Sequence, residues 1–151
     1  MERCLTEERV TKSLIKWLIV NNWTIISFDY PQSGTGRALH PNEEVSKTEG
    51  IIIPDIVAHK GDKVIFFENK NRFVLADYEK VENLRLNNNY SRSIRLLTSH
   101  YPHKSILYGI GQPYKVDWNK KAIKNSGMVD FVVAVNADGT VIVLYDPSLI
   151  F

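Results

Sequence analysis

The strongest constraint in the sequence is a pair of apolar runs separated by Gly61-Asp62. The runs cover residues 51–60 and 63–70 and are rich in β-branched and aromatic side chains, which favours strands. A two-residue loop with glycine first is typical of a type II′ β-hairpin. Because so short a loop determines which residues face each other, Lys60 should pair with Lys63. Counting outward from that pair, Asp55 should lie opposite Glu68.

This register places two acids side by side. Directly opposed residues of an antiparallel pair have Cβ atoms about 5 Å apart, and like charges are unfavourable there. Alternation puts Asp55, Glu68 and Lys70 on the same face as the apolar Val57 and Phe66. Charges on an apolar surface are costly unless they are compensated. A divalent cation would compensate them, since Mg²⁺ binds carboxylate oxygens, keeps several waters and binds substrate phosphates.

The rest of the chain predicts a mixed α/β fold, built around this hairpin as one domain over residues 1–151. Residues 91–100 fit either a helix or a strand, and Gly111 with Pro113 is expected to end a strand that begins at Ser105. The other predicted elements are a helix from Thr6 to about Asn22, a strand over residues 23–30, helices over 74–87 and 117–125, and strands over 105–110, 131–136 and 140–145.

One acid of the first helix stands out by its position. At 100° per residue, Glu7 falls in the middle of the apolar stripe that Val10, Leu14 and Leu18 form. Glu7 therefore either reaches the acidic site or lies one turn beyond the core, where it is solvated.

The polar segment between Pro31 and Gly50 is longer than most loops of compact domains, which indicates a functional role. It leads directly toward Asp55, so we expect it to lie over the carboxylates. Residues of this segment, and one that follows the hairpin, are candidates for contacts with phosphate groups. These candidates are Ser33, Thr35, Arg37 and Arg72.

The distribution of charge is more informative than the total. The chain of 151 residues has a net charge of +2, but eight of its Lys and Arg residues and only one acid lie between Arg85 and Gly127. This pattern fits either a polyanion held near metal-binding acids or a solvated helical face. No apolar run approaches the roughly 18 residues of a membrane span, and the single Cys4 cannot form an internal disulfide. We therefore expect a cytoplasmic protein without a membrane partner.

A short motif in the hairpin has a known counterpart. Pro54-Asp55, twelve residues, and then Glu68-Asn69-Lys70 resemble the signature of the PD-(D/E)XK nuclease superfamily, which includes type II restriction endonucleases and Holliday-junction resolvases. The resemblance covers about Thr6 to Ile110. It implies a restriction-endonuclease-like αβββαβ core with an appended C-terminal helix and β-hairpin. The competing interpretation is a structural charge cluster in which Lys70 neutralises Asp55 or Glu68.

The resemblance also implies roles for individual residues. Asp55 and Glu68, with the backbone carbonyl of Asn69, would hold Mg²⁺, for which Mn²⁺ could substitute. Glu7 occupies the place of a glutamate in the first helix of resolvases and would complete the metal shell directly or through water. Lys70 would position or deprotonate the attacking water, and deprotonation requires a pKa lowered by burial. Cleavage would leave a 5′-phosphate and a 3′-hydroxyl.

Three functions follow as hypotheses. The first is a Mg²⁺-dependent endonuclease of restriction type that cuts double-stranded DNA as a homodimer without a small-molecule cofactor. The long loop and the C-terminal hairpin favour it, because sequence readers need elements that contact bases. The second is a structure-specific nuclease of the Holliday-junction or repair type, favoured by the spacing of the hairpin. The third is a catalytically silent DNA-binding subunit.

Overall fold

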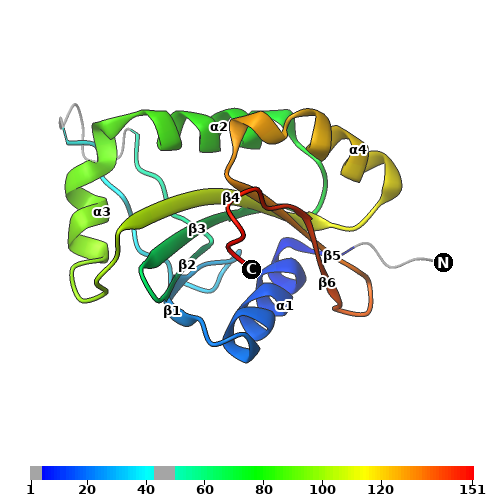
Figure 1. The fold of residues 1–151 in the computed structure, drawn as a ribbon, viewed down its shortest axis with the longest axis horizontal. Coiled ribbons are helices and arrows are strands. Elements are labelled where there is room, and N and C mark those ends of the chain that lie inside the picture. Colours follow the sequence, from blue (N-terminus) through cyan, green and yellow to red (C-terminus); the bar gives the residue numbers. More distant parts are fainter. Residues whose placement is uncertain (1–4, 43–49) are drawn as a thin grey trace.

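The computed structural model describes residues 5–42 and 50–151, so Cys4 lies outside the described residues. One six-stranded sheet, with strands in the order β1-β2-β3-β4-β5-β6, is covered by α1 on one face and by α2, α3 and α4 on the other (Figure 1). The predicted mixed α/β class is therefore confirmed. The elements are α1 Glu7–Val20, β1 Thr24–Phe28, β2 Ile56–Lys60, β3 Lys63–Asn69, α2 Leu75–Leu86, α3 Ser91–Leu97, β4 Ser105–Pro113, α4 Val116–Lys124, β5 Phe131–Val135 and β6 Val141–Tyr145.

The central hairpin has the predicted register. β2 and β3 pair antiparallel from Lys60 with Lys63 to Ile56 with Phe67. Gly61 has φ +60°, as the first position of a type II′ turn requires. β3, β4 and β5 are parallel to one another, so the carboxyl ends of these three strands lie at one end of the sheet, where the hairpin also carries its acids.

The first helix forms as its sequence predicts. The Thr6 hydroxyl accepts a hydrogen bond from the Arg9 backbone N–H at 3.1 Å and caps the helix. Val10, Leu14 and Leu18 are fully buried in the core on this face of the sheet. Because Glu7 belongs to the same stripe one turn earlier, it lies where the stripe leaves the core at the end of the sheet.

Two local expectations are settled or corrected by the structure. The ambiguous residues 91–100 contain a helix, α3. The strand that begins at Ser105 does not stop near Gly111 but continues to Pro113. A side chain at Gly111 would collide with Leu14 and Asn69, so this glycine permits a close approach between α1 and the sheet instead of ending a strand.

The loop after β1 divides into two parts. Its first part stays beside the hairpin, since Asp29 N donates to Asp55 O at 2.8 Å. Its second part leads away: Leu39 is fully buried in the core on the α2 face, and His40 N donates to Ser93 Oγ of α3 at 2.9 Å. The expectation that the whole loop lies over the carboxylates is therefore wrong for this second part, because the buried Leu39 anchors it toward α3. Residues 43–49 lie outside the described residues.

In the part of the chain that the structure describes, every helix is too short or too polar to cross a membrane.

Candidate active site

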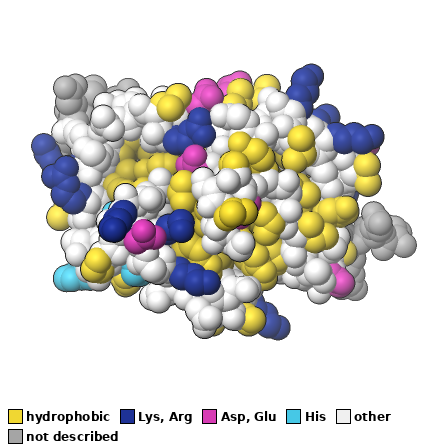
Figure 2. Space-filling model, in the orientation of Figure 1, with side chains coloured by type: hydrophobic (Ala, Val, Ile, Leu, Met, Phe, Trp, Pro, Cys, Tyr) yellow, Lys and Arg dark blue, Asp and Glu magenta, His cyan; other side chains and the backbone are white. Residues whose placement is uncertain are grey.

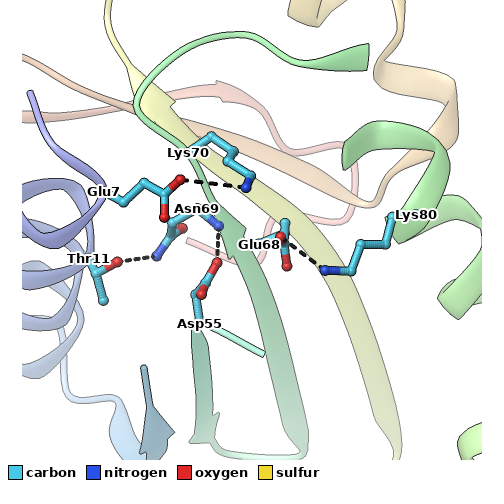
Figure 3. A network of polar contacts seen from close by, with 7 residues as sticks. All are labelled: Glu7, Thr11, Asp55, Glu68, Asn69, Lys70 and Lys80. Carbon is cyan, nitrogen blue, oxygen red and sulfur yellow. Dashed lines mark hydrogen bonds and ion pairs between the residues drawn. The ribbon is translucent and has the colours of Figure 1, made fainter. Parts of the chain in front are cut away.

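Two carboxylates meet at the end of the β2–β3 hairpin (Figure 3). Asp55 N donates to Phe67 O at 3.0 Å. Since Phe67 is already the partner of Ile56, the regular pairing of the two strands ends at Ile56 and becomes irregular at Asp55. The Asn69 backbone N–H then donates to Asp55 Oδ2 at 2.6 Å. Glu68 projects from β3 toward the same face, where its side chain is 12% exposed. Asp55 and Glu68 are neighbours, as their mutual charge effect shows, but the regular strand pairing ends before Asp55 and does not itself place it opposite Glu68.

The two acids share an environment that disfavours negative charge. Burial, reinforced by the charge of Glu68, raises the pKa of Asp55 to about 8, although the Asn69 N–H opposes the shift. Burial also raises the pKa of Glu68, and the Lys80 ammonium opposes that shift. At neutral pH this pair would therefore be stabilised by further positive charge.

Helix α2 supplies one positive charge that partly compensates the two acids. Lys80 Nζ lies 3.2 Å from Glu68 Oε1. Asp77, one turn earlier in the helix, is 9% exposed, and its burial raises its pKa. The sequence reasoning missed both residues. Their signal was their place in the helix, because they flank Tyr78 and Val81 on its buried side.

Lys70 lies just beyond β3, and its ammonium is held by an acid of the opposite layer. Its Nζ is 3.5 Å from Glu7 Oε1, and both side chains are 32% exposed. Burial alone would lower the pKa of Lys70, but the charges of Asp77, Glu7 and Glu68 outweigh that effect and raise it. The requirement for a general base, a lowered pKa, is thus not met. Of the two roles expected for Lys70, positioning fits this geometry.

Glu7 reaches the end of the sheet that carries the acids, where it pairs with Lys70; its contact with a metal through water stays a prediction. Within residues 5–42 and 50–151, no group of three or more His, Cys, Asp and Glu side chains is placed to hold a metal ion. Glu7 therefore does not join Asp55 and Glu68 in a three-carboxylate shell, and it binds the Lys70 ammonium instead. The α1 helix carries it to the end of the sheet, beside Lys70 and not between the two acids.

Asn69 joins the hairpin to the first helix. Its side chain points away from the acids, and its Nδ2 donates to Thr11 Oγ1 at 3.1 Å (Figure 3). The Asn69 side chain is therefore engaged with α1, and the role of its backbone carbonyl as a metal ligand stays a prediction. Thr11, which is 1% exposed, was also missed, and a buried polar residue in an apolar helix stripe was its signal.

The donor set fits a hard cation. Two neighbouring carboxylates and one backbone carbonyl are oxygen ligands, and Mg²⁺ needs only one or two protein carboxylates because it keeps several waters. The raised pKa values of Asp55 and Glu68 show that the protein itself leaves their charge under-compensated. A bound cation would relieve this.

The four residues predicted to contact phosphate differ in their hydrogen bonding and in their exposure. Ser33 Oγ donates to Asp29 Oδ1 at 3.0 Å, and Thr35 Oγ1 donates to Phe28 O at 2.7 Å, so both hydroxyls shape the loop. Arg37 and Arg72 are exposed. Contacts of these four residues with phosphate stay predictions.

Comparisons of the chain with protein-family models, with curated proteins and with solved structures find no match. The resemblance to PD-(D/E)XK nucleases therefore rests on the hairpin motif and on the arrangement of the elements around it.

Proposed function

We propose that this protein is a metal-dependent endonuclease of the PD-(D/E)XK type that hydrolyses phosphodiester bonds in duplex DNA, with restriction as its role. One observation carries the proposal: Asp55 and Glu68 meet at the end of a hairpin, with Lys70 two residues further along. The order α1, β1, β2, β3, α2, β4 around that hairpin, with α3 inserted between α2 and β4, supports a restriction-endonuclease-like core.

The carboxylates of Asp55 and Glu68, with the backbone carbonyl of Asn69, would hold Mg²⁺ or Mn²⁺. Two observations support this. The two adjacent acids are buried, and the ammonium of Lys80 pairs directly with one of them, Glu68. When bound, the ion supplies Lewis-acid activation of the scissile phosphate and of a water molecule.

The protein's own residues would orient the reactants. Lys70, kept protonated by the acids around it, offers N–H donors to a phosphate oxygen and to the attacking water. Glu7 holds the Lys70 side chain in place, and the Asn69 N–H fixes the Asp55 carboxylate. Hydrolysis forms a bond between the water oxygen and phosphorus and breaks the P–O3′ bond, which leaves a 5′-phosphate and a 3′-hydroxyl.

Cleavage of both strands of a duplex requires two sites, so the nuclease would act as a homodimer. The edge strand β6 supports this, because Val141–Tyr145 contains no charged residue, and sheet edges without charges tend to pair with another chain. Light scattering after gel filtration measures the mass in solution, and a monomer at all concentrations would contradict the dimer.

A cleavage assay tests the proposal directly. Supercoiled plasmid, phage DNA, four-way junctions and flap substrates are incubated with Mg²⁺, Mn²⁺ or EDTA. We expect cutting that needs the metal and is lost in Asp55→Ala. Discrete fragments from phage DNA indicate restriction, whereas selective cutting of junctions indicates a resolvase.

Failure to cut any of these substrates with either metal would overturn the nuclease proposal. If the wild type then still binds DNA, the silent DNA-binding subunit becomes the better description.

A further inference from the structure

Helix α4 has a basic surface that packing does not explain. Lys120, Lys121 and Lys124 lie on it, and Asp117 is its single acid. All three lysines are exposed, and Figure 2 shows Lys and Arg side chains standing out over α4 at the upper right. Of the nine residues of this helix, all of them described, Ala122 alone is buried. Most of the helix therefore serves the surface and not the core.

The helix begins at the end of the sheet that carries the acids. β3 and β4 run parallel with Asn69 paired to Gly111, so the residues that follow β4 start beside the strand end from which Lys70 projects. Lys121 Nζ lies 5.9 Å from the centre of the Phe73 ring, and Phe73 follows Lys70 by three residues. This contact joins α4 to the loop that leaves the active site.

A buried hydrogen-bonded chain fastens the same helix to α2. Tyr78 Oη donates to Gln112 Oε1 at 2.8 Å, and Gln112 Nε2 donates to Trp118 O at 3.3 Å. The Lys115 ammonium lies 4.5 Å from the centre of the Trp118 ring. The position of α4 relative to the active-site loop is therefore set by specific contacts on both sides.

The structure also divides the basic segment of the sequence into separate groups. Arg85 is engaged by Asp130. Arg92 and Arg95 lie on α3, and Lys104 lies just before β4, at the amino ends of the parallel strands and so away from the acids. Of the described part of this segment, the three α4 lysines and Lys115, which directly precedes α4, combine exposure with a place beside the active-site loop, and the Lys115 ammonium lies against the Trp118 ring.

The outer face of α2 offers a poor alternative path, since Glu79 is exposed and Glu82 is half-buried there, and both would repel a polyanion. The favourable path for DNA leads from Lys70 past the exposed Arg72 to α4.

We infer that the lysines of α4 bind the phosphate backbone of duplex DNA on one side of the cleaved bond. This inference rests on the proposed function. Lysine ammonium groups are mobile point charges suited to phosphates, and such contacts position the DNA without reading its sequence. Lys120 to Lys124 span about 6 Å of the helix axis, a length over which the two strands of a DNA duplex together carry about three phosphates. Three lysines on it can each neutralise one.

Fluorescence anisotropy of a labelled duplex, with Ca²⁺ in place of Mg²⁺ and over a range of KCl concentrations, tests the inference. The test variant carries Lys120→Ala, Lys121→Ala and Lys124→Ala. We expect its affinity to fall about tenfold or more near physiological salt, and the slope of log K against log[KCl] to become shallower by about 2.7, or about 0.9 per contact. The loss should be equal for unrelated duplex sequences.

A matched control removes the same charge elsewhere, through Arg92→Ala, Arg95→Ala and Lys104→Ala. It should leave affinity and slope nearly unchanged. Arginine at the three α4 positions should restore binding. Should the triple variant fail to fold, judged by its melting temperature, the single changes Lys120→Ala and Lys124→Ala should each lower the slope by about one.

The outcomes separate this inference from the proposed function. If the wild type cuts DNA but the α4 variant binds as tightly as the wild type, or the control loses as much, the inference is wrong and the nuclease stands. If the wild type neither binds nor cuts DNA, both fall.

Discussion

Helix α2 pairs with two acids at opposite ends of the sheet, and the two pairs differ in one respect. In the middle of the helix, Lys80 Nζ lies 3.2 Å from Glu68 Oε1, and near its end Arg85 Nη1 lies 3.3 Å from Asp130 Oδ1. Both oxygens of the Asp130 carboxylate have partners, because Oδ1 pairs with Arg85 and Oδ2 accepts from the Tyr108 backbone N–H at 2.9 Å. Glu68 instead has a second acid, Asp55, beside it.

The difference distinguishes a structural ion pair from a candidate active site. At Asp130, one carboxylate meets one guanidinium and one N–H, and Arg85 Nη2 also donates to Gly127 O at 3.1 Å. At Asp55, burial and the neighbouring charge raise the pKa to about 8. Buried charge without full compensation costs stability. Such a destabilising arrangement of buried charge is expected to persist where function requires it.

The largest effect should be on cleavage. Asp55→Asn keeps the shape of the side chain but removes the charge of a proposed metal ligand. Supporting residues of metal sites typically contribute tenfold to a hundredfold, so loss of a ligand should lower the single-turnover cleavage rate by at least about a hundredfold. Asp130→Asn should keep most of the activity when assayed at a temperature where it is folded. Equal losses in the two variants would contradict the distinction.

Stability should depend on pH through the active-site acid. Asp55 has a folded-state pKa of about 8, above its ordinary value of 3.8, so between these pH values the folded state holds a proton that the unfolded state has released. The contribution of Asp55 to stability is then greatest below about pH 4 and falls as pH rises toward 8. The free energy of unfolding without metal should decrease by on the order of 2–4 kcal/mol over this range.

Urea unfolding in EDTA at several pH values measures this slope. Asp55→Asn should flatten it, and Asp130→Asn should not. Addition of Mg²⁺ at pH 8 should restore about 2.7 kcal/mol in the wild type at a hundred times its Kd and much less in Asp55→Asn. A wild-type stability that rises from pH 5 to pH 8 in EDTA would contradict the account of this site.

How far these features follow from sequence depends on how local they are. The register from Lys60 with Lys63 to Ile56 with Phe67 was predictable because a two-residue turn leaves one register, whereas the irregular backbone at Asp55 was not. Helical spacing placed Glu7 on the buried stripe of α1 but left open whether it reaches the acids or is solvated. The roles of Lys80 and Thr11 depend on how α2 and α1 cross the sheet, which no local pattern specifies. Gly111 was misread for the same reason, since the side chains that crowd it come from α1 and β3.

The same two aspartates should have opposite effects on stability. At pH 8 without metal, Asp55→Asn removes a disfavoured charge and should raise the free energy of unfolding by about 1–3 kcal/mol. Asp130→Asn leaves Arg85, which is 25% exposed, without its charge partner and should lower it by about 1–2 kcal/mol. Urea unfolding with a shared m-value measures both. If both variants are less stable than the wild type, Asp55 is a structural residue.

The smallest effect should come from the two cations of α2. Lys80 is 42% exposed, so Lys80→Met should change stability by less than about 1 kcal/mol. Its removal should nevertheless raise the pKa of Glu68 further, because the ammonium opposes the upward shift that burial causes. Since a metal ligand must be deprotonated, the rise of cleavage activity with pH should then occur at higher pH.

Arg85→Met provides the control on the same helix, since it removes a cation of equal charge from the pair with Asp130. It should lower stability more than Lys80→Met but leave the pH profile of kcat/KM where it is. An unchanged profile in Lys80→Met would mean that Lys80 does not influence Glu68 during catalysis. The contrast between the two ion pairs of α2 would then rest on Asp55 alone.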